Sequence, residues 1–207
     1  MKEAEVAFRS GELTLGGLLA NPGGDAPAAV VCHPHPMYGG SMNNNVVEAI
    51  LAALWQAGYA TLRFNFRGVG LSEGEHDGGP GEVDDAIAAA RFISAQQGVR
   101  KGGLLMAGYS FGAMVAVSAG YEHSEIARVV AVALPIAMAD VRIPAGASKP
   151  ILLVSGDLDS YSPAKEVQAL KAKIGDAARL VIVDGADHFF GGNEAELSRV
   201  LAAELTT

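Results

Sequence analysis

The stretch Leu104–Met114 reads LLMAGYSFGAM, and it places Ser110 between two glycines at the point where an apolar run ends. The run before it, GGLLMAGY, has the continuous apolar character of a buried strand, and FGAMVAVSAGY after it is apolar all round, as in a buried helix. A G-x-S-x-G turn between a strand and a helix is so tight that the serine hydroxyl projects above the sheet. Glycine supplies 26 of the 207 residues, so the pattern alone leaves an ordinary turn serine open. The flanking strand and helix favour an exposed nucleophile.

Short β-rich runs alternate with longer helical ones along the chain. The runs at 4–10 and 13–21 are expected to pair antiparallel at a sheet edge, through a turn at Ser10–Gly11. Continuous apolar runs, which suit a parallel sheet covered on both faces, follow at 27–34, 59–66, 102–109, 128–135, 149–156 and 178–185. Helical spacing and end signals place helices at 43–58, 81–98, 111–121, 162–175 and 193–205. This alternation predicts an α/β fold with an eight-stranded, mostly parallel, doubly wound sheet in one domain over 1–207.

Composition narrows the classes of function. The formal charge of −8 argues against a surface for nucleic acid, because such binding depends on Lys and Arg. No apolar stretch approaches 18 residues, and the charged start MKEAEVAFRSG differs from a signal peptide, so we expect no membrane span and a cytoplasmic location. The single Cys32 excludes an intramolecular disulfide and is expected to be a buried small hydrophobe.

A serine hydroxyl needs a base to take its proton and a carboxylate to orient that base. The seventh expected strand runs into GDLDSYSP, which carries Asp157 and Asp159, and the eighth runs into GADHFF, which carries His188. Because ligands collect at the carboxyl ends of parallel strands, these residues are expected to meet Ser110 on one rim of the sheet.

The motifs HPHPMYGGSMNN, RFNFRGVGLSEGE, GYSFGA, GDLDSYSP and GADHFF, in this order, resemble the α/β-hydrolases over essentially the full chain. The resemblance is to a small lidless bacterial subgroup, and only about 16 residues, Pro135 to Pro150, separate the sixth and seventh expected strands, too few for a lid. It implies that Ser110 is the nucleophile and His188 the base. Asp159 matches the acid, in the pattern G-x-x-D-x-x-x-P, while its rival Asp157 is expected to be a structural turn carboxylate.

An oxyanion hole needs two N–H groups, and the resemblance assigns one to the amide of Phe111. The second should come from the loop HPHPMYGG, which departs from the H-G-x pattern of many relatives. Prolines have no N–H, and alignment of the loop start favours the amide of His35, with Met37 as the second choice. The His33 and His35 rings, without acidic or sulfur ligands nearby, do not indicate a metal site.

The stretch NFRGVGLSEG has glycines at 68 and 70 but glutamate at 73, so it fails the G-x-G-x-x-G fingerprint of nucleotide binding. In relatives this loop buttresses the oxyanion loop, and Arg67 is expected to form a structural ion pair. The following patch, EGEHDGGPGE, is expected to be a solvated loop.

The sequence therefore predicts a serine hydrolase that cleaves small carboxylic esters through an acyl-enzyme on Ser110. No cofactor or metal is expected, and the partner is a small-molecule ester, with the protein a monomer or homodimer. An aminopeptidase-like amide hydrolase, a thioesterase or a dienelactone-type hydrolase would use the same residues. A hydrolase-fold protein that binds without turnover is the alternative from another class, and the complete set of three chemical residues argues against it.

Overall fold

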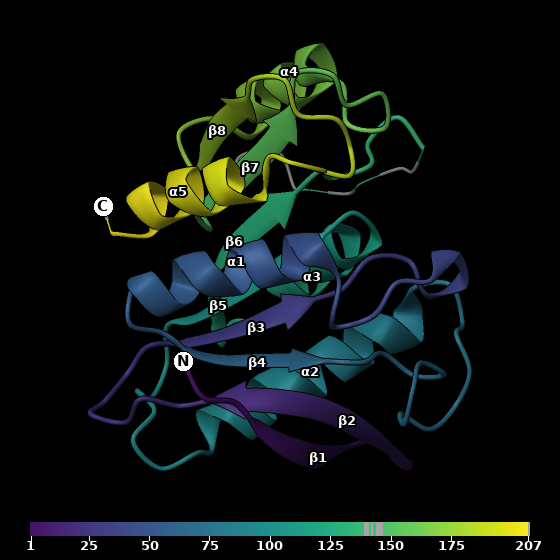
Figure 1. Ribbon diagram of the computed structural model, residues 1–207, viewed down its shortest axis with the longest axis vertical. Helices are drawn as coiled ribbons and strands as arrows, with labels where there is room; N and C mark the ends of the chain where they lie inside the picture. The colour runs from purple at the N-terminus through teal and green to yellow at the C-terminus, as the bar shows by residue number, and fades with distance from the viewer. Residues whose placement is uncertain (139–140, 142, 144–146, 207) are drawn as a thin grey trace.

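A computed structural model describes residues 1–138, 141, 143 and 147–206 of the chain. Its strands form one eight-stranded sheet in the order β1-β2-β4-β3-β5-β6-β7-β8 (Figure 1). The strands are β1 (Ala4–Ser10), β2 (Leu13–Ala20), β3 (Ala28–Cys32), β4 (Ala60–Phe64), β5 (Leu104–Tyr109), β6 (Ile126–Val132), β7 (Ile151–Gly156) and β8 (Ala178–Val183). The α-helices are α1 (Asn45–Gln56), α2 (Pro80–Ser94), α3 (Phe111–Glu122), α4 (Ala164–Ile174) and α5 (Glu194–Leu205).

The direction of the strands confirms the predicted sheet. β1 pairs antiparallel with β2, and β2 antiparallel with β4, whereas all pairs from β4 to β8 are parallel. β3 lies between β4 and β5 in the sheet. After β3 the chain forms β4 along one edge of β3, and it later forms β5 along the opposite edge. Such a reversal opens a crevice at the carboxyl ends of the strands, where doubly wound proteins bind their ligands.

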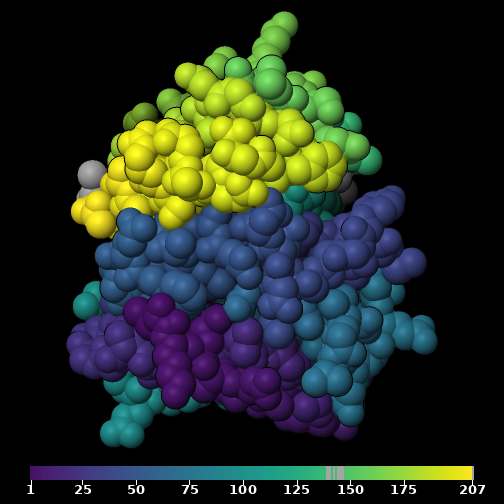
Figure 2. Space-filling view, viewed as in Figure 1, coloured from purple at the N-terminus to yellow at the C-terminus, as the bar shows by residue number. Residues whose placement is uncertain are grey.

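Helices cover both faces of the sheet. Successive residues of a strand point to opposite faces, so each central strand contributes to two separate buried clusters. Val31 and Leu105 share one buried cluster with α1 and α5, while Val30 and Met106 share the other with α2, α3 and α4. In Figure 1, α1 and α5 cross in front of the sheet and α2 and α3 lie behind it. Figure 2 shows α1 and the C-terminal segment packed side by side over the front face. Continuous apolar runs were therefore the correct signal for doubly covered strands.

The structure corrects two local predictions. The second predicted helix, 81–98, ends at Ser94, because Val99 bridges to Ala26 and the Gly98 carbonyl accepts the Ala26 N–H, which ties this segment to the chain before β3. A short 3₁₀ helix, η1 (Pro36–Tyr38), was not predicted. It follows from Pro36, whose fixed backbone angle suits the first turn of a helix.

The segment between β6 and β7 is where a lid domain would be inserted. Positions 139–140, 142 and 144–146 of this segment lie outside the described residues, and the others form no helix or strand. Of the residues that the structure describes, none belongs to a helix both long and apolar enough to cross a membrane.

Candidate active site

Ser110 stands on the turn between β5 and α3 with φ 54° and ψ −118°, a conformation that is strained for a residue with a side chain. Its N–H donates to the Val132 carbonyl of β6 over 3.0 Å, which holds the turn against the sheet. The flanking glycines are required by space. A Cβ on Gly108 would lie 2.0 Å from the Gly112 carbonyl oxygen, and a Cβ on Gly112 would lie 2.3 Å from the Cys32 carbonyl oxygen. The G-x-S-x-G pattern thus forms the sharp strand-to-helix turn that the sequence indicated.

A chain of hydrogen bonds links Ser110 to a histidine and a carboxylate. Ser110 Oγ lies 3.0 Å from His188 Nε2, and His188 Nδ1 lies 2.9 Å from Asp159 Oδ2. His188 follows β8 and Asp159 follows β7, so three separate strand ends contribute. His188 is 7% exposed and Asp159 is 3% exposed, so little water competes for these bonds. The arrangement suits transfer of a proton from the serine hydroxyl to the imidazole.

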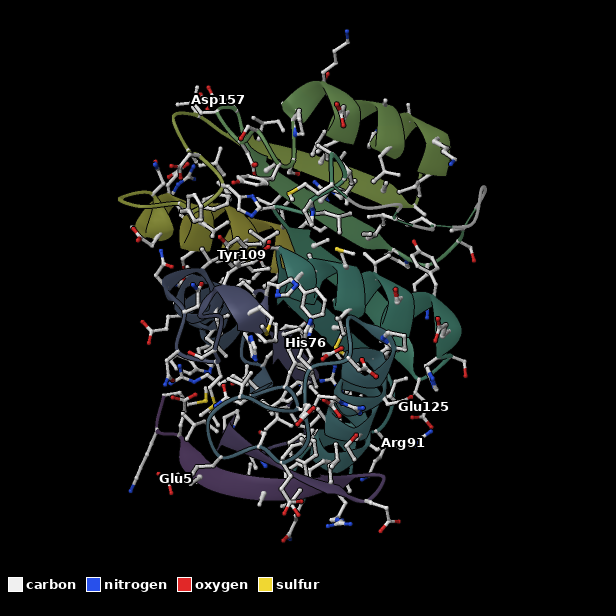
Figure 3. All side chains as sticks on the ribbon, turned by 90° about the vertical axis from the view of Figure 1, so that its right-hand side faces the viewer. Glu5, His76, Arg91, Tyr109, Glu125 and Asp157 are labelled. Atoms are coloured by element: carbon white, nitrogen blue, oxygen red, sulfur yellow. The ribbon has the colours of Figure 1, made fainter. Side chains whose placement is uncertain are left out.

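The carboxylate beside His188 is Asp159 and not Asp157. Asp159 Oδ1 accepts the N–H groups of Tyr161 and Ser162 over 2.8 and 2.9 Å, which leaves Oδ2 for the imidazole. Asp157 is exposed, and its Oδ1 accepts the Gly185 N–H, a turn contact of the kind the sequence predicted for it. Figure 3, which faces the carboxyl ends of the strands, shows Asp157 at the periphery, away from Tyr109.

Hydrogen bonds to Tyr109 and Asp187 fix the loop that carries His188. The Tyr109 hydroxyl, at the end of β5, donates to the His188 carbonyl over 3.0 Å. Burial raises the pKa of this hydroxyl, and the charges of Asp159 and Asp187 raise it further, so Tyr109 remains a neutral donor. Asp187 Oδ1 accepts the N–H groups of Phe189 and Phe190, which closes the turn after the histidine.

Two backbone N–H groups near Ser110 have no partner among the described residues. Neither the Phe111 N–H nor the His35 N–H donates a hydrogen bond to any of the residues described. The rings of these two residues are neighbours, with centroids 4.9 Å apart. The Met37 N–H, in contrast, donates to His35 Nδ1 over 3.2 Å. Burial, and then the neighbouring His76, lower the pKa of the His35 ring, which favours the neutral form that this acceptor requires.

His33 pins the start of this loop to the end of β4. Its Nε2 accepts the Phe66 N–H over 3.1 Å, which places the single ring proton on Nδ1. Nδ1 lies 2.6 Å from the Pro34 carbonyl oxygen and donates to it. Burial lowers the pKa of His33 to about 4, so the ring is neutral. Both ring nitrogens are engaged, which leaves His33 no free lone pair for a metal ion.

The NFRGVGLSEG loop is hydrogen-bonded to the segment that follows the HPHPMYGG loop. Asn65 Oδ1 accepts the Met42 N–H over 2.9 Å. Arg67 donates from Nη2 to the fully buried Asp85 over 2.8 Å and from Nε over 3.1 Å, which confirms the predicted structural ion pair. Asp85 also accepts the Ser10 hydroxyl, so this carboxylate joins the β1–β2 turn to the loop.

The prediction of a solvated loop for EGEHDGGPGE was wrong at its end. Glu82 is fully buried, and its carboxylate accepts the N–H groups of Asp77 and Gly79. It also lies 2.7 Å from His76 Nδ1, and the His76 ring packs 4.8 Å from that of His35. Figure 3 shows His76 near the middle of the strand ends. Nothing in the spacing of a histidine and a glutamate six residues apart indicated this contact.

A cavity of about 730 Å³ opens over Ser110. Most of its described lining is apolar or aromatic, and that lining includes no Asp, Glu, Lys or Arg side chain. The aromatic residues Tyr161 and Phe189 were not predicted as site residues, although each lies within two positions of Asp159 or His188. The described lining residues are Pro34, His35, Tyr38, Gly39, Gly40, Asn44, Gly78, Tyr109, Ser110, Phe111, Met114, Pro135, Met138, Tyr161, His188 and Phe189.

The sheet order, together with a serine on the β5–α3 turn and a histidine and a carboxylate on later strand ends, defines the class of α/β-hydrolases. Comparison with known proteins agrees, since the family of alpha/beta hydrolase domains matches residues 28–198. An uncharacterized protein of Rickettsia prowazekii is 36% identical over 191 residues, which cover 88% of this chain and 80% of the relative.

Solved structures resemble the chain over nearly its whole length. A serine hydrolase homologue from Coxiella burnetii has 34% identity and a TM-score of 0.89, with 99% of this chain and 98% of the other covered. A serine hydrolase without a lid from Xanthomonas campestris has 31% identity and a TM-score of 0.84, with 98% and 93% covered. The chain belongs to the alpha/beta hydrolase family, and its fold is that of the lidless members.

Proposed function

We propose that this protein hydrolyses small, uncharged carboxylic esters through an acyl-enzyme on Ser110. The observation that carries the proposal is the hydrogen-bonded chain from Ser110 Oγ to His188 Nε2, over 3.0 Å, and from His188 Nδ1 to Asp159, over 2.9 Å. The position of Ser110 on the strained turn at the carboxyl end of β5 gives the proposal further support.

In the acylation step, Ser110 Oγ attacks the ester carbonyl carbon and His188 Nε2 takes the hydroxyl proton. Asp159 holds the imidazole in the required tautomer and stabilises the imidazolium. The negative charge that develops on the carbonyl oxygen is stabilised by the N–H groups of Phe111 and His35, assisted by the N-terminus of α3. The intermediate collapses when the bond to the alcohol oxygen breaks, and the alcohol leaves with the proton from His188.

In the deacylation step, a water molecule takes the place of the alcohol. His188 accepts one water proton while the oxygen attacks the acyl carbon, and the bond to Ser110 Oγ then breaks. The proton returns to Ser110 from His188, and the carboxylic acid is released. Apart from the ester and water, both steps use only groups of this chain. Met37 is a poorer oxyanion donor than His35, because its N–H is already bonded to the His35 ring.

The lining of the cavity supports an uncharged ester over the alternatives on the same residues. An aminopeptidase-like substrate brings an ammonium group, and a dienelactone-type substrate or a phosphate-bearing thioester brings an anion. Burial of such a charge requires a partner of opposite sign. The described lining includes no carboxylate, lysine or arginine that could be such a partner.

Labelling with a fluorophosphonate probe, followed by a burst assay with p-nitrophenyl acetate, tests the proposal. The wild-type protein should be labelled once and should release one equivalent of p-nitrophenol in an initial burst if deacylation is slower than acylation. Ser110→Ala should lose both labelling and turnover, whereas Ser124→Ala, at an exposed serine beyond α3, should keep them. Labelling or ester hydrolysis that persists in Ser110→Ala contradicts the proposal.

A further inference from the structure

Two partly exposed aromatic rings flank the histidine of the site. The ring of Tyr161 lies 4.7 Å from that of His188, at an interplanar angle of 43°, and the ring of Phe189 lies 5.5 Å away, at 87°. Both rings border the cavity that contains Ser110. Tyr161 is 38% exposed and Phe189 is 60% exposed, so each presents aromatic surface that the protein itself does not cover.

The backbone holds both rings in place through the contacts that form the site. The Tyr161 N–H donates to Asp159, and the Tyr161 carbonyl accepts the Ala137 N–H over 3.2 Å. The Phe189 N–H donates to Asp187 over 2.9 Å, and its carbonyl accepts from the Asn45 side chain over 3.2 Å. The backbone from which both rings extend is therefore fixed before a ligand arrives, so no rearrangement of these loops has to accompany binding.

The chemistry of the proposed reaction decides which part of an ester meets these rings. His188 Nε2 must pass its proton to the alcohol oxygen, so that oxygen lies within about 3 Å of Nε2 when the bond breaks. The carbonyl oxygen lies on the other side, against the N–H groups of Phe111 and His35. The rings that pack against His188 therefore border the alcohol portion of the ester.

We propose that Tyr161 and Phe189 form a subsite for a flat, uncharged aromatic group on the alcohol side, so that the preferred substrates are esters of aryl-alkyl alcohols. This inference rests on the proposed function and adds the substrate class. Aromatic contacts in offset or edge geometry favour a planar ring over a saturated ring beyond the effect of buried area. The preference expected from one such contact is about threefold to tenfold in kcat/KM.

The test compares 2-phenylethyl acetate with 2-cyclohexylethyl acetate. Both esters give the same acetyl-enzyme, and their alcohols differ mainly in whether the ring is planar, so the ratio of their kcat/KM values reports the alcohol subsite. We expect a ratio of about three to ten for the wild type. Phe189→Leu and Tyr161→Leu should lower the ratio towards one, while Tyr161→Phe, which keeps the ring, should retain it.

Leu71→Ala is the matched control, because Leu71 is an exposed apolar residue that does not belong to the described lining of the cavity. It should leave the ratio unchanged. The Leu substitutions alter only atoms beyond Cβ, so we expect the fold and the nucleophile to be kept. Thermal unfolding and fluorophosphonate labelling of each variant check this expectation.

Acyl transfer gives a second measurement on the alcohol side alone. When 2-phenylethanol attacks the acetyl-enzyme, its oxygen bonds to the acyl carbon and its proton passes to His188. The bond from the acyl carbon to Ser110 Oγ then breaks, His188 returns the proton to Ser110 Oγ, and 2-phenylethyl acetate is released. This product should form faster than the cyclohexyl ester from equal concentrations of the two alcohols, and the excess should disappear in Phe189→Leu.

A wild-type ratio of one, or a ratio that both Leu variants leave unchanged, would overturn the subsite while Ser110-dependent hydrolysis continues. If neither ester is hydrolysed and Ser110 is not labelled, the proposed function fails and the subsite fails with it. The two failures are therefore distinguished by the labelling of Ser110.

Discussion

Acid should weaken the fold through His33, whose ring is buried between the end of β3 and the end of β4. The neutral ring accepts the Phe66 N–H at Nε2 and donates to the Pro34 carbonyl from Nδ1. Protonation would place an N–H at Nε2 directly against the Phe66 N–H and would leave a charge in an apolar site. Both effects disfavour the protonated ring in the folded protein. The pKa of His33 is therefore lowered to about 4, chiefly by burial.

The size of the effect follows from linkage. In the unfolded chain His33 titrates near 6.5, so between about pH 6.5 and 4 the unfolded state binds a proton that the folded state does not. The stabilisation is fully present above pH 6.5 and is lost as the pH falls towards 4. The difference between the two pKa values corresponds to about 3 kcal/mol of unfolding free energy, most of which is lost by about pH 4.5.

Urea unfolding of the wild type and of His33→Ala, from about pH 7.5 to 4.5, measures this loss. The unfolding free energy of the wild type should fall by about 2–3 kcal/mol more than that of the variant, since all other titrating groups are shared. His123→Ala, at the end of α3, serves as the control and should change in parallel with the wild type. Parallel curves for wild type and His33→Ala would refute the reasoning.

Three further predictions concern the site. Asp159→Asn should lower kcat by about 10⁴, as loss of the orienting carboxylate does in a serine protease, whereas Asp157→Asn should retain turnover; steady-state kinetics decide, and a larger loss at Asp157 would contradict the assignment. Gly112→Ala should destabilise the protein by about 1–3 kcal/mol and impair labelling of Ser110, because the new Cβ would lie 2.3 Å from a backbone oxygen, whereas Gly191→Ala has open space and should be neutral in thermal unfolding. Among p-nitrophenyl esters, kcat/KM should peak from acetyl to butyryl and decline by octanoyl; a steady rise of about 0.8 kcal/mol of binding per CH₂ would instead indicate a long apolar acyl pocket.

Much of the fold could be predicted from local pattern. Continuous apolar runs identified doubly covered strands such as β3 and β5, because both faces of each strand are buried. The tight turn at Ser110 was also predictable, since two glycines mark positions where a Cβ has no room. The end of α2 was not, because it depends on the Ala26–Val99 bridge between segments distant in sequence.

Part of the candidate site could also be predicted from the local pattern of the sequence. Asp159 and His188 follow strands, so the topology alone brings them to the rim that carries Ser110. The contact between His76 and Glu82 could not be inferred, because a loop of glycines and charged residues gives no sign that one carboxylate is fully buried. The aromatic pair Tyr161 and Phe189 was present in the motifs, but only the geometry shows that both rings pack against His188.

The site is divided unequally between the middle and the margin of the sheet. Ser110 follows β5, which has strands on both sides, whereas His188 follows β8, the outermost strand. Outer elements with fewer neighbours open at lower free energy than central ones. Partial detachment of β8 would therefore separate His188 from Ser110, and we expect mild denaturation to abolish turnover while most of the secondary structure persists. Loss of turnover would then report the opening of one sheet margin before the core unfolds.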